Sequence, residues 1–152
     1  MMITLTDSIE INAKPKEVYE GLVQVFSSQE YFKKWHKDHL KCSWTMGEPF
    51  EVGSLLYVEE YMHNSLHKMK FLGTKNELNR NIEYKLLFPI SIICPRGSFT
   101  IDPQNGSSIF TATLSFRFGK LFQKFAKSRV EAIIQHMKDE GENLKKIIEI
   151  DL

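Results

Sequence analysis

The order of its hydrophobic periodicities constrains this chain more than any other feature of its sequence. Alternating, strand-like runs come first, separated by short turn-forming segments. These runs are 54–62, 66–74, 81–88, 96–102 and 108–118. From about 119 to 150 the apolar residues instead recur at three-to-four spacing, which indicates a long amphipathic helix. Short connections favour antiparallel hairpins, so the sequence predicts an antiparallel sheet followed by one long helix.

The N-terminal part adds a strand and two helical segments. Residues 3–13, "ITLTDSIEINA", alternate as a strand does, and residues 14–26 follow with Pro15 at the start of a helical pattern. Residues 28–40, "SQEYFKKWHKDHL", predict a second short helix or helical turn. No repeat, low-complexity tract or linker interrupts the 152 residues, so we expect one α+β domain spanning 1–152.

Charge and composition exclude several kinds of partner. The 20 Lys and Arg residues nearly balance the 19 Asp and Glu residues, which gives a formal net charge of +1. A chain so close to neutral is not expected to bind nucleic acid or to carry a polybasic membrane anchor. Its longest apolar run, "PISIIC", is far shorter than the roughly 20 residues that a membrane span needs. Neither composition nor patterning indicates an oligomeric state.

Cysteine usage indicates the compartment. Cys42 and Cys94 share no CxxC spacing and form no disulfide framework. The N-terminal "MMITLTDSIEINAKP" lacks the apolar core of a signal peptide. We therefore expect a protein of the reducing cytoplasm.

One hairpin places a carboxylate on an apolar face. A turn centred on Asn64-Ser65 pairs Glu60 with Met69 and Glu59 with Lys70. The face that includes Glu60 then consists of Leu56, Val58, Glu60, Met62, His67, Met69 and Phe71. A carboxylate on such a face costs several kcal/mol unless it is paired, protonated or bound to a metal ion. We expect Glu60 to face inward with a compensating partner, although a register shift of one residue would turn it outward.

The last helix supplies two further side chains that can compensate Glu60. His136 and Glu140 are four residues apart on the apolar stripe of that helix, so both can reach a single ion or water. His36 or His39 could add another ligand. Two or more histidines with two carboxylates suit zinc or another borderline divalent ion such as iron, nickel or manganese. Taken singly, His136 and Glu140 could also be an ordinary helix-surface pair, and His36 and His39 could lie in a solvated turn.

The order of elements, the opening "IEINAKPKEVYEGL" and the closing "EGENLKKIIE" resemble the START-related (SRPBCC, polyketide cyclase-like) superfamily of helix-grip proteins. The resemblance covers nearly the whole chain. It implies a curved antiparallel sheet wrapped around the C-terminal helix, with a cavity between them. Members of this superfamily include lipid carriers, cyclases and hydrolases, so the fold leaves the function open.

The histidines and glutamates resemble the metal site of one branch of that superfamily, typified by 2,4-diacetylphloroglucinol hydrolase. The H-x-x-x-E pair of its last helix is matched here by His136 and Glu140, and its strand glutamate by Glu60. Its histidine after a tryptophan in the second helical segment is matched by His39, which follows Trp35. The resemblance implies a divalent metal ion, zinc first, held by His39, Glu60, His136 and Glu140.

Two functions follow from this reading. The first is a metal-dependent hydrolase or lyase that acts on a small aromatic or polyketide-like ketone in an apolar cavity, with His67, His36 or Tyr84 moving protons. The second is a protein that binds or carries a hydrophobic small molecule or lipid without chemistry, in which the polar groups only orient the ligand. The sequence leaves both open.

Overall fold

The computed structural model describes residues 2–62, 64–117 and 127–152. Its strands are β1 (Met2–Ile11), β2 (His39–Met46), β3 (Leu55–Met62), β4 (Ser65–Glu77), β5 (Asn81–Leu86), β6 (Arg96–Gln104) and β7 (Ser107–Arg117). Its helices are α1 (Pro15–Ser27), α2 (Gln29–Trp35), the 3-10 turn η1 (Ile90–Ile92), α4 (Lys127–Lys146) and the π-helical turn η2 (Ile147–Asp151). Among the described residues, no helix is long and apolar enough to cross a membrane.

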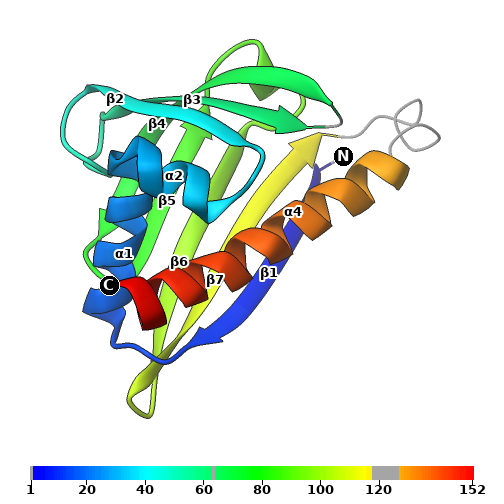
Figure 1. The fold of residues 1–152 in the computed structure, drawn as a ribbon. Coiled ribbons are helices and arrows are strands. Elements are labelled where there is room, and N and C mark those ends of the chain that lie inside the picture. The colour runs from blue at the N-terminus through cyan, green and yellow to red at the C-terminus, as the bar shows by residue number, and fades with distance from the viewer. Residues whose placement is uncertain (1, 63, 118–126) are drawn as a thin grey trace.

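The strands form one 7-stranded antiparallel sheet in the order β1-β7-β6-β5-β4-β3-β2. Figure 1 shows α4 running diagonally across the concave side of this curved sheet, with α1 and α2 beside it and the C-terminus next to α1. The hydrophobic core fills the space between the two layers. The order of periodicities predicts the sheet and the long helix, and their packing is the helix-grip arrangement that the family resemblance implies.

Local sequence explains where the two short helices begin. Pro15 occupies the first turn of α1, where its missing N–H costs nothing, and the Lys14 N–H donates to Glu17 Oε1 at 3.3 Å. The hydroxyl of Ser28 accepts a hydrogen bond from the Tyr31 N–H and so caps α2. The two helices therefore follow each other directly, and α2 ends just before the edge strand β2.

Three details differ from the sequence prediction. The segment 28–40 is helical only to Trp35, and a strand, β2, which the predicted strand runs omit, begins at His39. Bulges between His39 and Lys41 and between Trp44 and Met46 break the alternation that identifies a strand. The predicted helix 119–150 is confirmed from residue 127 onward and finishes in η2, whereas 118–126 lie outside the described residues.

The third difference is the register of the β3–β4 hairpin. Met62 pairs with Ser65 and Glu60 with His67, so the predicted partners, Met69 for Glu60 and Lys70 for Glu59, are wrong by two positions. The turn comes one residue earlier than predicted, with Asn64 in the left-handed conformation at φ 61°. A shift of two keeps each side chain on its face, so Glu60 faces inward as expected.

A glycine brings α1 close to the C-terminal end of the long helix. A Cβ at Gly21 would lie 2.5 Å from Ile148 Cγ1 and 2.8 Å from its Cδ1. Ile148 belongs to η2 and is only 6% exposed, so it has little room to move. The packing of η2 against α1 therefore requires a residue without a side chain at this position.

We expect Gly21→Ala to destabilise the fold by about 1–3 kcal/mol through overpacking, even though Ala normally favours a helix over Gly by about 1 kcal/mol. Urea denaturation of the variant measures the effect. Combined with Ile148→Ala, the substitution should cost much less than it does alone, because the smaller side chain leaves room. A Gly21→Ala protein as stable as the wild type would contradict this packing.

Candidate functional site

The space between α4 and the sheet contains an apolar cavity of about 150 Å³. Much of its wall is aromatic: Phe26, Phe32, Trp35, Phe50, Phe71 and Phe99. Several of these rings meet edge to face, which holds them in fixed positions. All seven residues of the predicted inward face of the β3–β4 hairpin also line this cavity. Such a wall suits an apolar or aromatic ligand.

Four polar side chains from three elements converge at one side of this cavity. His39 Nε2 of β2 lies 2.9 Å from Glu140 Oε2 and 3.5 Å from Glu60 Oε2. His136 Nε2 of α4 lies 3.5 Å from Glu140 Oε1 and 4.0 Å from Glu60 Oε2. The four residues that are predicted from the sequence as metal ligands therefore lie close together in the structure.

The hydrogen bond on the far side of His39 fixes which nitrogen carries a proton. His39 Nδ1 lies 2.9 Å from the Phe32 carbonyl oxygen, which can only accept, so Nδ1 is the donor. In the neutral ring Nε2 then carries a lone pair, and this nitrogen lies 2.9 Å from Glu140 Oε2. Both His39 Nε2 and His136 Nε2 are buried without a hydrogen bond of acceptable geometry. Lone pairs that face each other in this way need a cation between them, either a proton or a metal ion.

His136 and Glu140, both on α4, shift each other's pKa. Burial alone would lower the pKa of His136, but the negative charges of Glu140, Glu60 and Asp38 raise it to about 9. Burial alone would raise the pKa of Glu140, but His136 and His39 hold it below its usual value. Burial dominates at Glu60, and its pKa is raised. Glu60 is therefore the carboxylate most in need of a further positive partner.

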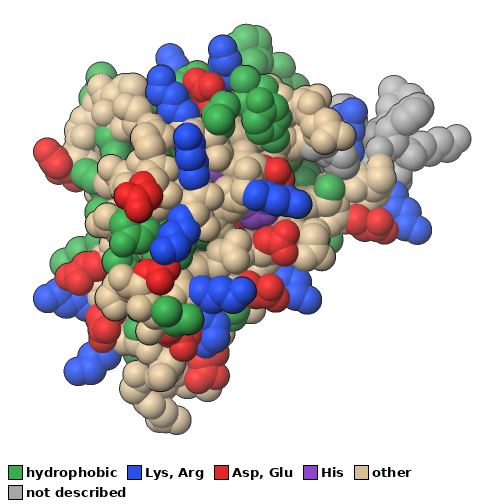
Figure 2. Space-filling model, in the orientation of Figure 1, with side chains coloured by type: hydrophobic (Ala, Val, Ile, Leu, Met, Phe, Trp, Pro, Cys, Tyr) green, Lys and Arg blue, Asp and Glu red, His purple; other side chains and the backbone are tan. Residues whose placement is uncertain are grey.

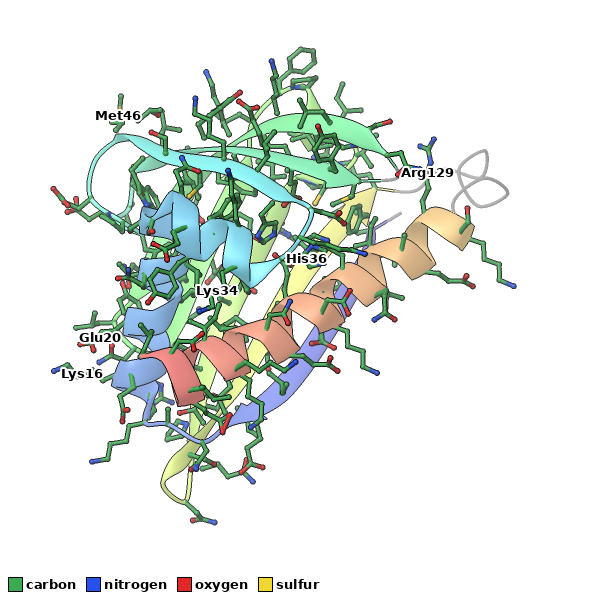
Figure 3. The ribbon with its side chains drawn as sticks, in the orientation of Figure 1. Lys16, Glu20, Lys34, His36, Met46 and Arg129 are labelled. Carbon is green, nitrogen blue, oxygen red and sulfur yellow. The ribbon has the colours of Figure 1, made fainter. Side chains whose placement is uncertain are left out.

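His36 lies on the outer side of this cluster. Figure 2 shows histidine side chains exposed only in a small gap near the middle of this face, and Figure 3 places His36 between the α2–β2 connection and α4. Its ring packs against that of His136, with centroids 3.9 Å apart. Its Nε2 lies 3.6 Å from Asp139 Oδ2, and burial lowers its pKa.

A second group of possible ligands, His36, Asp38 and His136, lies next to the first and shares His136 with it. His36 Nδ1 already accepts a hydrogen bond from the Asp38 N–H at 3.0 Å. Its lone pair is therefore in use, which leaves this group a weaker ligand set than the one facing the cavity. Asp38 Oδ2 lies 4.0 Å from His136 Nδ1, on the side of the ring opposite the cavity.

The other two proposed proton-transfer residues lie in the cavity wall. His67 is the cross-strand partner of Glu60 and lines the cavity with it. Tyr84 lies on β5, and burial raises its pKa well above the usual 10. A Cβ at Gly97 would collide with the Tyr84 hydroxyl, so Gly97 sets the position of this ring. Sequence reasoning missed Gly97, because its pairing with Tyr84 follows only from the register of β5 and β6.

Trp35 is a second residue whose role the sequence does not reveal. Its indole Nε1 donates to the Glu140 carbonyl at 2.9 Å, and its own carbonyl accepts from Asn143 Nδ2 at 2.9 Å. These two bonds tie α2 to the turn of α4 that carries Glu140. The contact joins residues 105 positions apart, and no local pattern signals it.

Comparison with known proteins identifies the fold. No family model and no curated protein matches the chain. Among solved structures, the Zhui aromatase/cyclase from Streptomyces sp. R1128 superposes with a TM-score of 0.78 at 12% identity, covering 98% of this chain and 94% of that one. Truncated norcoclaurine synthase from Thalictrum flavum superposes with a TM-score of 0.74 at 9% identity, covering 97% and 94%.

A third neighbour has a higher sequence identity. A polyketide cyclase-like protein from Corynebacterium glutamicum has a TM-score of 0.66 at 18% identity, covering 99% of this chain and 94% of that one. The structural neighbours are thus polyketide aromatase/cyclase-like and related helix-grip proteins. At these identities the likeness establishes the helix-grip fold.

The cysteine in the cavity wall should not act as a nucleophile. Burial raises the pKa of Cys94 to about 12 and that of Cys42 to about 11. We expect both thiols to react with a disulfide reagent at pH 8 at least about a hundredfold more slowly than free cysteine, because little thiolate forms. Titration of the native protein and of the protein in denaturant measures this. Rapid modification of native Cys94 would contradict it.

Proposed function

We propose that this protein holds a divalent metal ion, zinc first, between His39, Glu60, His136 and Glu140, and acts on a small aromatic or polyketide-like ketone in the adjoining cavity as a hydrolase or lyase. The observation that carries the proposal is the pair of buried imidazole nitrogens, His39 Nε2 and His136 Nε2, that face two carboxylates without a hydrogen bond. A dication would neutralise both carboxylates and accept both lone pairs at once.

The donor set fits such an ion. Two imidazole nitrogens and two carboxylates are ligands of zinc and of the other borderline divalent ions. The Phe32 carbonyl orients His39 from behind, which is the support that metal-binding histidines ordinarily have. No cysteine joins these groups: Cys42 Sγ donates to the Phe26 carbonyl at 3.3 Å, and Cys94 belongs to neither candidate ligand group of the described residues.

Other residues of the cavity would bind the ligand and transfer protons. A divalent ion at this place would supply polarisation of a carbonyl group. The aromatic wall would bind the ring of the ligand and exclude water. Tyr84 stays protonated because of its raised pKa, so its hydroxyl can donate a hydrogen bond to the ligand. His67, next to Glu60, could accept or return a proton inside the cavity, and His36 could do so on the side of the surface.

The neighbours support the ligand class. One of the norcoclaurine synthase structures was determined in complex with dopamine and hydroxybenzaldehyde, so a similar fold holds small aromatic molecules. That complex belongs to a protein 11% identical to this chain, and it bears on the kind of ligand only.

The alternative function is a non-enzymatic binder or carrier of a hydrophobic small molecule. The almost wholly apolar wall favours it. In that case a proton would take the place of the metal ion, and the charged His136 imidazole, with its pKa of about 9, would form an ion pair with Glu140. The two functions therefore differ in what lies between the imidazoles and the carboxylates.

Metal analysis separates them. We expect protein purified without a histidine tag and incubated with Zn²⁺ to retain about one equivalent after desalting, since four ligands converge. His136→Ala and Glu140→Gln should each lower zinc affinity by about a hundredfold or more in a chelator competition, because each removes a ligand. His67→Ala is the matched control in the same cavity and should leave the affinity nearly unchanged. No retained zinc in the wild type would favour the carrier.

A further inference from the structure

One end of the sheet carries a pair of strongly exposed apolar side chains. The segment 87–95 joins β5 to β6 and contains η1. Its Phe88 is 78% exposed, the most of any large hydrophobic side chain among the described residues, and its Ile92 is 59% exposed. Ile90 and Cys94 of the same segment line the cavity. The segment therefore presents one set of residues to the cavity and the other to solvent.

Cationic side chains surround this segment. Lys85 and Arg96 stand directly opposite each other at the two strand ends that the segment joins. The Lys70 carbonyl accepts from the Leu87 N–H, and the Arg117 N–H donates to the Ile93 carbonyl, so both residues border the segment as well. All four cationic side chains are exposed.

These cations lack acidic partners. Among the described residues, none of Lys70, Lys85, Arg96 and Arg117 forms an ion pair. Two acidic residues lie on the neighbouring strands, and each has other partners. Glu59 pairs across the strands with Lys68 and accepts from the Tyr57 hydroxyl. Glu83, two residues before Lys85 on β5, forms an ion pair with Lys75. Figure 2 shows hydrophobic side chains gathered at the top of the molecule, where η1 lies in Figure 1, with Lys and Arg side chains beside them. A chain that is nearly neutral overall thus concentrates unpaired positive charge around Phe88, the most exposed aromatic side chain in the described part of the chain.

We propose that this end of the molecule docks on an anionic lipid surface, with Phe88 and Ile92 inserted at the headgroup level and Lys70, Lys85, Arg96 and Arg117 on the lipid phosphates. Apolar side chains flanked by exposed cations are the combination that holds peripheral proteins at anionic bilayers. A neutral protein surface would satisfy the apolar pair but would leave the four cations unpaired. Because Ile90 and Cys94 join the same segment to the cavity wall, docking would place the cavity next to the bilayer. The contact is reversible and differs from a polybasic anchor, which the near-zero net charge excludes.

The test is vesicle co-sedimentation at low ionic strength, with phosphatidylcholine vesicles that contain or lack phosphatidylserine. We expect binding to the phosphatidylserine vesicles alone, lost when salt is raised. Lys85→Glu with Arg96→Glu should weaken it by about tenfold or more, since each cation near such a surface contributes about a factor of five. Lys14→Glu with Lys16→Glu at the start of α1 makes the same charge change in a part of the molecule away from the segment 87–95 and should have much less effect. If both double variants lost vesicle binding equally, the proposal of a local docking site around the segment 87–95 would be wrong.

Insertion has its own readout. Phe88→Trp should shift its fluorescence to shorter wavelength with phosphatidylserine vesicles, because the indole leaves water. Leu78→Trp is the matched control: Leu78 is 70% exposed in the turn at the other end of β5 and should not shift. The measurement needs neither metal nor cavity ligand, so its outcome is independent of the proposed function. No vesicle binding by the wild type would overturn the proposal, and the patch would then have to meet a protein.

Discussion

The contact between the long helix and the sheet depends on how two buried carboxylates are neutralised. Glu60 comes from β3 and Glu140 from α4, and both lie within 4.0 Å of the imidazoles of His39 and His136. Two like charges in a poorly solvated place would push the layers apart unless positive charge lies between them. The middle of α4 is thus held by charge as well as by the buried Ile133 and Met137. At the C-terminal end Leu144 and Ile147 are almost fully buried, and the Lys145 ammonium donates to the Glu10 carbonyl.

The seven-residue helix α2 supports this arrangement from behind. Its Phe32 carbonyl accepts from His39, its Trp35 indole donates to the Glu140 carbonyl, and Asn143 donates back to Trp35. One short helix therefore orients a side chain of the edge strand and fixes the matching turn of the long helix. An edge strand would otherwise be one of the more mobile parts of such a fold, and a site needs its ligands fixed within fractions of an ångström.

The sequence predicts the architecture and the four converging residues, but not the contacts that hold them. The period-two and three-to-four patterns identify the sheet and the helix. The predicted register of the β3–β4 hairpin is wrong by two positions, but side chains alternate with a period of two, so Glu60 is still correctly predicted to face inward. Strand β2 is missed because it is a bulged edge strand with polar residues on its outer side. The Trp35–Glu140 bond and the fit of Gly97 against Tyr84 depend on tertiary geometry between distant residues, and no local pattern encodes that geometry.

The cavity combines this polar cluster with a small apolar volume, and the combination limits what can bind. At about 150 Å³ the cavity has the size that holds one benzene-sized ring. A fused polycycle or a long acyl chain would need the aromatic wall to open. The polar cluster occupies one side of the cavity. Burial, with a smaller contribution from the negative charges of Glu140 and Glu60, raises the pKa of Tyr84 and keeps its hydroxyl protonated. A single-ring ligand with one carbonyl would therefore lie with that oxygen toward the Tyr84 hydroxyl or toward a cation held by the imidazoles, and with its ring against Phe32 and Phe99. The reverse orientation would bury the oxygen unpaired among phenyl rings.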